Sequence, residues 1–199
     1  RAIFQAALAV GIEQGDAVDL EIMVPFVSTD KETALFRARF EAIAASLRHE
    51  SGRAPTWRLG VMIETPRAAL RCDRICADAQ FVSFGTNDLT QMTYGLSRDD
   101  TGRFIRDYIA RGGLAHDPFH QLDVEGVGEL MRIGVERGRA TRPDLTVAVC
   151  GEHGGDAQTI RFCESLGMDY VSCSPYRAPA ARPPNPARRT PEVHRAPAP

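Results

Sequence analysis

Four short apolar segments, each followed by a polar or glycine-rich turn and then by a helical pattern, limit the possible folds more than any other feature. They cover residues 21–27, 59–63, 81–84 and 146–150. Their length, their Val, Ile and Phe content and the Gly, Pro or Asp residues around them are typical of buried strands. Polar and apolar residues do not alternate within them. We therefore expect both faces of each strand to be covered, as in a parallel sheet.

Helical patterns separate these segments. Residues 29–32 (Thr-Asp-Lys-Glu) form a capping box, which predicts the start of a long helix. Pro66 suits the first turn of the next helix, which is expected to carry Leu70, Ile75 and Cys76. Further helices are expected over 124–141 and 156–166, and residues 170–173 form one more short strand or turn. Strand alternating with helix predicts an α/β fold built on a parallel sheet.

Composition excludes several classes of protein. The chain has 199 residues, enough for one well-buried core, and a formal net charge of −2. This charge gives no reason to expect nucleic acid or an anionic membrane as a partner. No apolar run is long enough to span a bilayer, and five cysteines without an export signal indicate free thiols in the cytoplasm. Residues 178–199 are rich in Pro, Ala and Arg, so we expect a folded domain over 1–177 and a disordered tail.

Polar side chains stand where the predicted strands end. Glu64 follows the second strand, Asn87 and Asp88 follow the third, and Cys150 ends the fourth. The carboxyl edge of a parallel sheet is where α/β proteins and (β/α) barrels build their active sites. Each carboxylate alone could equally cap the helix that follows it. Two carboxylates converging on one edge repel each other unless a cation lies between them, so the pair favours a Mg²⁺ site.

The segment from Cys150 to Gly155 is the second candidate for chemistry. A thiol at a strand end, near a glycine-rich turn and a cation, is expected to have a lowered pKa and to exchange a proton. The alternative is a buried apolar cysteine. A zinc site of Cys150 and His153 with Cys163 and Cys173 fits no compact zinc motif. Arg98 could reach an anion, although an isolated arginine is more often solvated.

Several strings in one order resemble the C-terminal barrel of the pyruvate, phosphate dikinase branch of the phosphoenolpyruvate (PEP)-utilising enzymes. The strings cover residues 61–70, 84–100, 117–119, 126–128, 150–155 and 170–175. The resemblance extends over about residues 1–177. It implies part of a (β/α)8 TIM barrel, its C-terminal half, with about four βα units. Residues 66–67, 91–92 and 97–100 resemble the dikinases more closely than PEP synthase or enzyme I of the sugar phosphotransferase system.

The resemblance implies a role for each matching position. Glu64 and Asp88 would hold Mg²⁺. Cys150 would move the proton at C3 of pyruvate. Substrate-binding roles are implied for Glu64, Gly85, Thr86, Asn87, Asp88 and Arg98.

The resemblance also implies the reaction of the complete enzyme. In that reaction ATP, phosphate and pyruvate become AMP, diphosphate and PEP through a phosphorylated histidine. The nucleotide-binding and phosphohistidine domains would be the partners of this barrel, in a homodimer. We expect the chain to lack them, to lack the first half of the barrel, and to be inactive alone. Two alternatives remain open, which are a PEP synthase-type barrel and a non-catalytic truncated remnant.

Overall fold

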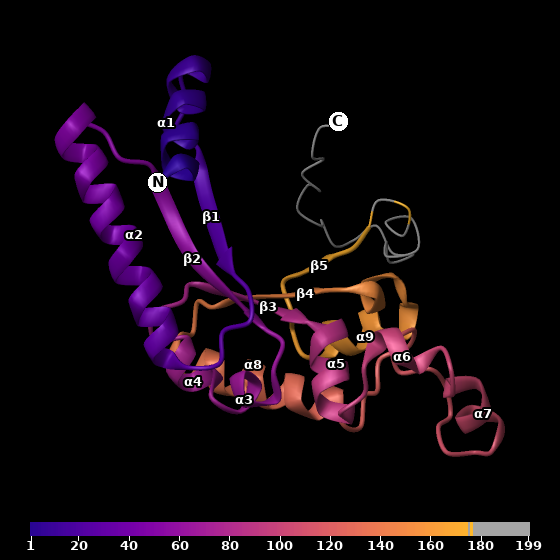
Figure 1. Ribbon diagram of the computed structural model, residues 1–199. Coiled ribbons are helices and arrows are strands. Elements are labelled where there is room, and N and C mark those ends of the chain that lie inside the picture. The colour runs from indigo at the N-terminus through magenta and orange to yellow at the C-terminus, as the bar shows by residue number, and fades with distance from the viewer. Residues whose placement is uncertain (175, 177–199) are drawn as a thin grey trace.

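The fold is built on one parallel sheet, seen in a computed structural model that describes residues 1–174 and 176 (Figure 1). Five strands lie in the order β1-β2-β3-β4-β5, so spatial order follows chain order. Each strand runs parallel to its neighbours. The strands are β1 (Asp19–Val24), β2 (Thr56–Ile63), β3 (Phe81–Gly85), β4 (Thr146–Cys150) and β5 (Tyr170–Ser172). The four predicted strands are confirmed, and the short run at 170–173 supplies a fifth.

Helices connect the strands, as the sequence pattern predicts. They are α1 (Ala2–Gln14), α2 (Asp30–Ser51), α3 (Pro66–Leu70), α4 (Cys72–Ile75), α5 (Thr86–Tyr94), α6 (Arg98–Thr101), α7 (Ile105–Ala110), α8 (Val127–Thr141) and α9 (Ala157–Ser165), with a 3₁₀ turn η1 (Glu152–Gly155). The capping box at the start of α2 is confirmed, because Thr29 and Glu32 each bond the other's backbone N–H. The expectation of a single helix after Pro66 is wrong. It divides at Arg71, whose φ of −118° interrupts the helical backbone.

The two faces of the sheet differ. Leu59, Val61 and Ile63 on β2 point into the main core, which they share with buried residues of α3, α4 and α8. The alternate residues form what we call the open face, where Arg58 pairs with Glu21 of β1. All five residues of β3 are buried, so two covered faces are confirmed for this central strand. The expectation is wrong for β1 and β5, because the residues of these two strands on the open face are exposed.

A parallel sheet with its helices on one side is the arrangement of a (β/α) barrel wall. In Figure 1 the helices from α3 to α9 lie below the sheet, and α1 and α2 flank β1 and β2. Phe4, Phe40 and Trp57 form an aromatic cluster that joins these two helices to the sheet, with Trp57 5.8 Å from both phenylalanine ring centres. The prediction of an α/β partial barrel is confirmed.

Two further expectations concern membrane-spanning helices and the end of the chain. No helix within residues 1–174 is long and apolar enough to cross a membrane. The boundary at 177 and the predicted tail over 178–199 lie outside the described residues.

Candidate functional site

Four positions on neighbouring strands meet at the carboxyl edge of the open face. Gly85 of β3 lies opposite Cys150 of β4, and Cys150 lies opposite Ser172 of β5. Glu64 follows the last paired residue of β2, and its carboxylate packs directly against Gly85. A Cβ atom at Gly85 would lie 2.5 Å from Glu64 Oε2, so only glycine leaves room for this carboxylate. We call this edge, together with Thr86, Asn87 and Asp88, the strand-end site.

Glu64 and Asp88 form a carboxylate pair. Glu64 is 3% exposed, and its Oε1 accepts a hydrogen bond of 2.7 Å from the backbone N–H of Phe26. Burial raises the pKa of Glu64, and the neighbouring Asp88 raises it further, while the Phe26 N–H lowers it. A cation beside Glu64 would oppose this rise, because positive charge stabilises the ionised form of a carboxyl group.

Phe26 is a participant that the sequence did not reveal. Its φ is +57°, and it is the one non-glycine with positive φ among the described residues. This backbone conformation costs an aromatic residue about 1–2 kcal/mol. It also directs the Phe26 N–H to the buried carboxylate of Glu64. A strained residue that orients an acidic side chain is typical of a functional site.

The turn after β3 is bonded to the turn after β4. Asn87 Oδ1 accepts a 3.2 Å hydrogen bond from the backbone N–H of Glu152. The hydroxyl of Thr86 is buried and lies 3.1 Å from the carbonyl oxygen of Cys150. Gly151 has a φ of +124°, and a Cβ there would lie 2.7 Å from Thr86 Oγ1, so glycine is required at this contact. The two turns therefore form one rigid rim beside Asp88.

Cys150 differs from the other cysteines of the core. Its side chain is partly exposed, whereas Cys72, Cys76 and Cys163 are buried. Burial raises the pKa of the Cys150 thiol, Glu64 and Asp88 raise it further, and a hydrogen bond with Ser83 lowers it. The thiol is thus in its protonated form near neutral pH, which is the form that can donate a proton. The lowering of this pKa was expected beside a bound cation, and it stays a prediction.

His153 also belongs to this rim, although the sequence suggested for it only an unconvincing zinc site. Its ring is fully buried. Nδ1 lies 2.8 Å from Thr86 Oγ1, and Nε2 lies 2.8 Å from the carbonyl oxygen of Pro118. Both ring nitrogens are therefore engaged within the protein. No spacing rule could find this arrangement, because the partners lie 67 and 35 positions away along the chain.

The buried ring predicts acid sensitivity of the fold. Burial lowers the pKa of His153 from its ordinary value of 6.5, against smaller raising effects of Pro118, Asp156 and Glu152, and His120 lowers it slightly. Below pH 6.5 the unfolded chain therefore binds more protons than the folded one. We expect the free energy of unfolding to fall as pH drops from 6.5 through the folded-state pKa, by at most about 1.4 kcal/mol per pH unit.

Urea titrations between pH 5 and 8 measure this effect. His153→Asn is expected to flatten the acid side of the stability profile, and His49→Asn, at an exposed position near the end of α2, is the matched control. Equal acid sensitivity in the wild type and in His153→Asn would contradict the prediction.

Arg98 is the predicted site residue whose side chain makes no hydrogen bond or ion pair with the strand-end site within the described part of the chain. It begins α6, beyond the end of α5, and its side chain is exposed. Its backbone N–H donates to Gln91 Oε1 at 3.0 Å. Among the described residues, no hydrogen bond or ion pair joins its guanidinium to Glu64, Asp88 or Cys150. A phosphate contact of Arg98 stays a prediction.

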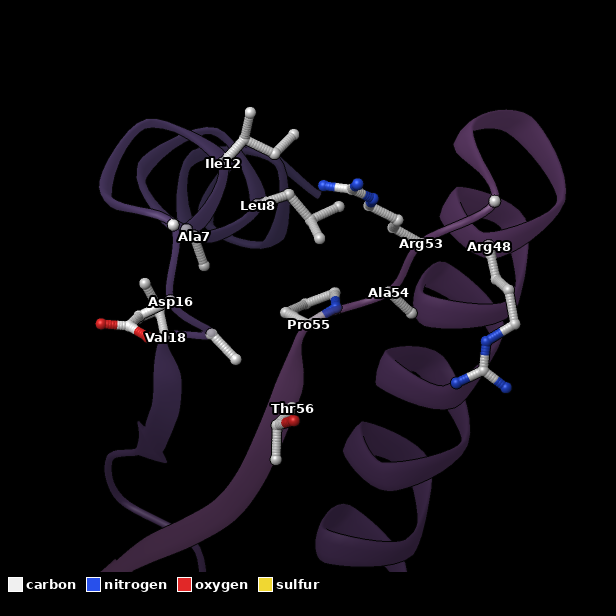
Figure 2. Close-up of a pocket in the computed structure, with 14 residues that line it drawn as sticks. Ala7, Leu8, Ile12, Asp16, Val18, Arg48, Arg53, Ala54, Pro55 and Thr56 are labelled. Carbon is white, nitrogen blue, oxygen red and sulfur yellow. The ribbon is translucent and has the colours of Figure 1, made fainter.

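A cavity of about 450 Å³ lies at the other end of the sheet (Figure 2). Its wall comes from α1, the end of α2 and the residues that precede β1 and β2. In Figure 2 the Arg53 side chain reaches across the gap toward Leu8 and Ile12 on α1. The cavity adjoins the amino ends of the strands and is separate from the strand-end site.

Comparison with known proteins agrees with this geometry. Residues 1–185 match the family described as PEP-utilising enzyme, PEP-binding domain. This chain belongs to that family. It is 53% identical over 182 residues to the pyruvate, phosphate dikinase of Rhizobium meliloti, and 52% identical to pyruvate, phosphate dikinase 2 of Zea mays. Each alignment covers 92% of this chain and 20% of the relative, so the chain spans about a fifth of the length of these enzymes.

Solved structures support the fold alone. A citrate lyase from Burkholderia xenovorans matches with a TM-score of 0.53 and 17% identity, over 81% of this chain and 47% of that protein. A pyruvate kinase from Cryptosporidium parvum matches with a TM-score of 0.53 and 12% identity, over 89% of this chain and 32% of that protein. At such low identities these matches support the barrel architecture and say nothing about chemistry.

Proposed function

We propose that this chain supplies part of the pyruvate/PEP site of a pyruvate, phosphate dikinase. That part is the strand-end site at the carboxyl edge of its sheet. The reaction at this site is phosphoryl transfer between a phosphohistidine and the enolate oxygen of pyruvate. One observation carries the proposal: the paired carboxylates of Glu64 and Asp88 lie on the same edge as the partly exposed thiol of Cys150. The dikinase relatives, at 50–53% identity, support this assignment over a PEP synthase-type barrel.

The donor set fits Mg²⁺. Glu64 and Asp88 would hold the ion, since Mg²⁺ takes one or two carboxylates and fills its other positions with water and substrate oxygens. Among the described residues no group of three or more His, Cys, Asp or Glu could hold a metal, so the protein offers no closed cage. The bound ion would supply positive charge to stabilise the enolate oxygen of pyruvate.

The remaining chemistry belongs to the side chains of the rim. The protonated thiol of Cys150 donates its proton to C3 of the enolate when pyruvate forms, and the thiolate removes a C3 proton in the reverse direction. Gly85 packs against Glu64 and Asn87 precedes Asp88, so both would border a substrate held between these carboxylates. The Phe26 N–H keeps the Glu64 carboxylate in its orientation.

The remainder of the reaction needs parts beyond this chain. In the proposed whole enzyme, ATP and phosphate charge a histidine on another domain, and the enzyme is a homodimer in the cytoplasm. A chain that covers a fifth of its relatives' length is expected to be inactive alone. A chimera, in which this chain replaces the 182 aligned residues of the Rhizobium meliloti dikinase, would provide the missing domains. A non-catalytic remnant would give an inactive chimera.

Calorimetry with oxalate, a stable mimic of the pyruvate enolate, tests the site directly. We expect the chain to bind oxalate only when Mg²⁺ is present. Asp88→Asn should weaken this binding at least about tenfold, because it removes one of two charged ligands. Asp99→Asn, at an exposed position on α6, is the matched control and should bind as the wild type does. Metal-independent binding, or equal binding by Asp88→Asn, would contradict the proposed ligands.

A further inference from the structure

A buried chain of hydrogen bonds runs behind the strand-end site. Thr86 Oγ1 lies 3.1 Å from the carbonyl oxygen of Cys150 and 2.8 Å from His153 Nδ1. His153 Nε2 lies 2.8 Å from the carbonyl oxygen of Pro118. Thr86 and His153 are both fully buried, so water does not compete for these contacts. These hydrogen bonds therefore connect three segments, which are the turn after β3, the turn after β4 and the loop before α8.

Counting protons fixes the state of the ring. The Pro118 carbonyl can only accept, so Nε2 carries a proton. Burial disfavours a second proton on the ring, which leaves Nδ1 as an acceptor. The single hydroxyl proton of Thr86 is then shared between two acceptors, His153 Nδ1 and the Cys150 carbonyl, with the shorter contact to His153. His153 thus determines where the Thr86 side chain sits.

Thr86 in turn limits where Cys150 can sit. Its Oγ1 lies in contact with the Cys150 carbonyl and close to Gly151, whose positive φ turns the chain sharply after the thiol. A shift of Thr86 would free the Cys150–Gly151 peptide and with it the direction of the thiol. Asn87, which bonds the Glu152 N–H, holds the same turn from its other end.

We infer that His153 is a positioning residue for Cys150, acting through the Thr86 hydroxyl as a neutral imidazole protonated on Nε2. Its consequence for catalysis rests on the proposed function, whereas its effect on the thiol does not. The competing explanation is that His153 only fills the core and ties the Pro118 loop to the rim. The two explanations differ in which ring nitrogen matters for Cys150.

Two substitutions separate the nitrogens. His153→Asn places an amide oxygen near the position of Nδ1, so it can still accept from Thr86 but cannot reach Pro118. His153→Gln places an amide near the position of Nε2, so it can still donate to Pro118 but leaves Thr86 without its partner. Thr86→Val removes the hydroxyl with little change of shape, and Thr86→Ser keeps it.

The rate of iodoacetamide alkylation at Cys150, measured by peptide mapping of the 199-residue chain, reports the position of the thiol. We expect His153→Gln and Thr86→Val each to raise this rate about tenfold. The variant that combines both substitutions should react no faster than either single variant. His153→Asn and Thr86→Ser should stay within about twofold of the wild type. Cys163, buried on α9, is the internal control and should not change in any variant.

Three outcomes would overturn the inference. They are equal effects of His153→Asn and His153→Gln, a parallel rise at Cys163, and a Thr86→Val variant that reacts as the wild type does. The readout needs neither Mg²⁺ nor substrate, so it is independent of the oxalate result. In the dikinase chimera, His153→Gln should lower kcat about tenfold with KM for pyruvate unchanged, and a raised KM with unchanged kcat would count against action through Cys150.

Discussion

Replacing Cys150 with alanine is expected to lower kcat of the dikinase chimera by about two to four orders of magnitude. The proposed reaction needs a proton at C3, and Cys150 is the thiol at the carboxyl edge that is partly exposed beside both carboxylates. Without a cation, burial raises the pKa of this thiol, so sulfur carries the proton that the enolate would take. Binding of oxalate with Mg²⁺ should remain, because alanine leaves Glu64 and Asp88 in place.

Solvent deuterium exchange into the methyl group of pyruvate measures this step in isolation. The exchange should be lost in Cys150→Ala, while phosphorylation of the histidine by ATP and phosphate on the other domain continues. Cys173→Ala is the control, since Cys173 is also partly exposed but lies beyond β5. Exchange in Cys150→Ala within tenfold of the wild type would exclude Cys150 as the proton donor.

Replacing Phe84 with alanine is expected to reduce the free energy of unfolding by about 3–5 kcal/mol. Phe84 is fully buried in the middle of the sheet, and its ring packs against α8 at Gly134. Alanine would leave a cavity between β3 and α8 that the rigid sheet cannot fill. The loss is a large part of the roughly 5–15 kcal/mol that stabilises a typical protein.

Urea denaturation followed by tryptophan fluorescence reports this loss. The lone Trp57 lies in the aromatic cluster with Phe4 of α1 and Phe40 of α2, away from the cavity that Phe84→Ala would create. Its fluorescence therefore reports unfolding of the whole sheet if the transition is cooperative. Phe104→Ala is the matched control, because Phe104 is 37% exposed, and should change stability by less than about 0.5 kcal/mol. A cost below about 1 kcal/mol for Phe84→Ala would mean that β3 is not the packed centre of the core.

The sequence predicted those features that depend on neighbouring residues. The capping box at Thr29, the strand that ends at Cys150 and the helix start at Pro66 each follow from local chemistry, and the structure contains all three. The proximity of Glu64 and Asp88 could also be predicted. Neighbouring parallel strands end at one edge of the sheet, and each of these residues follows closely on the end of its strand.

Other features depend on distances across the fold, which no local pattern encodes. The Phe26 N–H reaches Glu64 over 38 positions, and the buried partners of His153 come from two separate loops. The rise in the pKa of Cys150 comes mainly from burial, which only the packed structure determines. Arg98 was assigned by resemblance, and its place on α6 could not be derived from a spacing of ten residues.

The order of the five strands bears on how the domain is made. Because β1 to β5 lie side by side in chain order, each strand from β2 onward finds a partner already present when it leaves the ribosome. Every pairing joins strands that are consecutive along the chain, and the connection from β3 to β4, which holds α5 to α8, is complete before β4 is made. Synthesis can therefore extend the sheet one unit at a time, and Cys150 enters a rim whose two carboxylates are already in place.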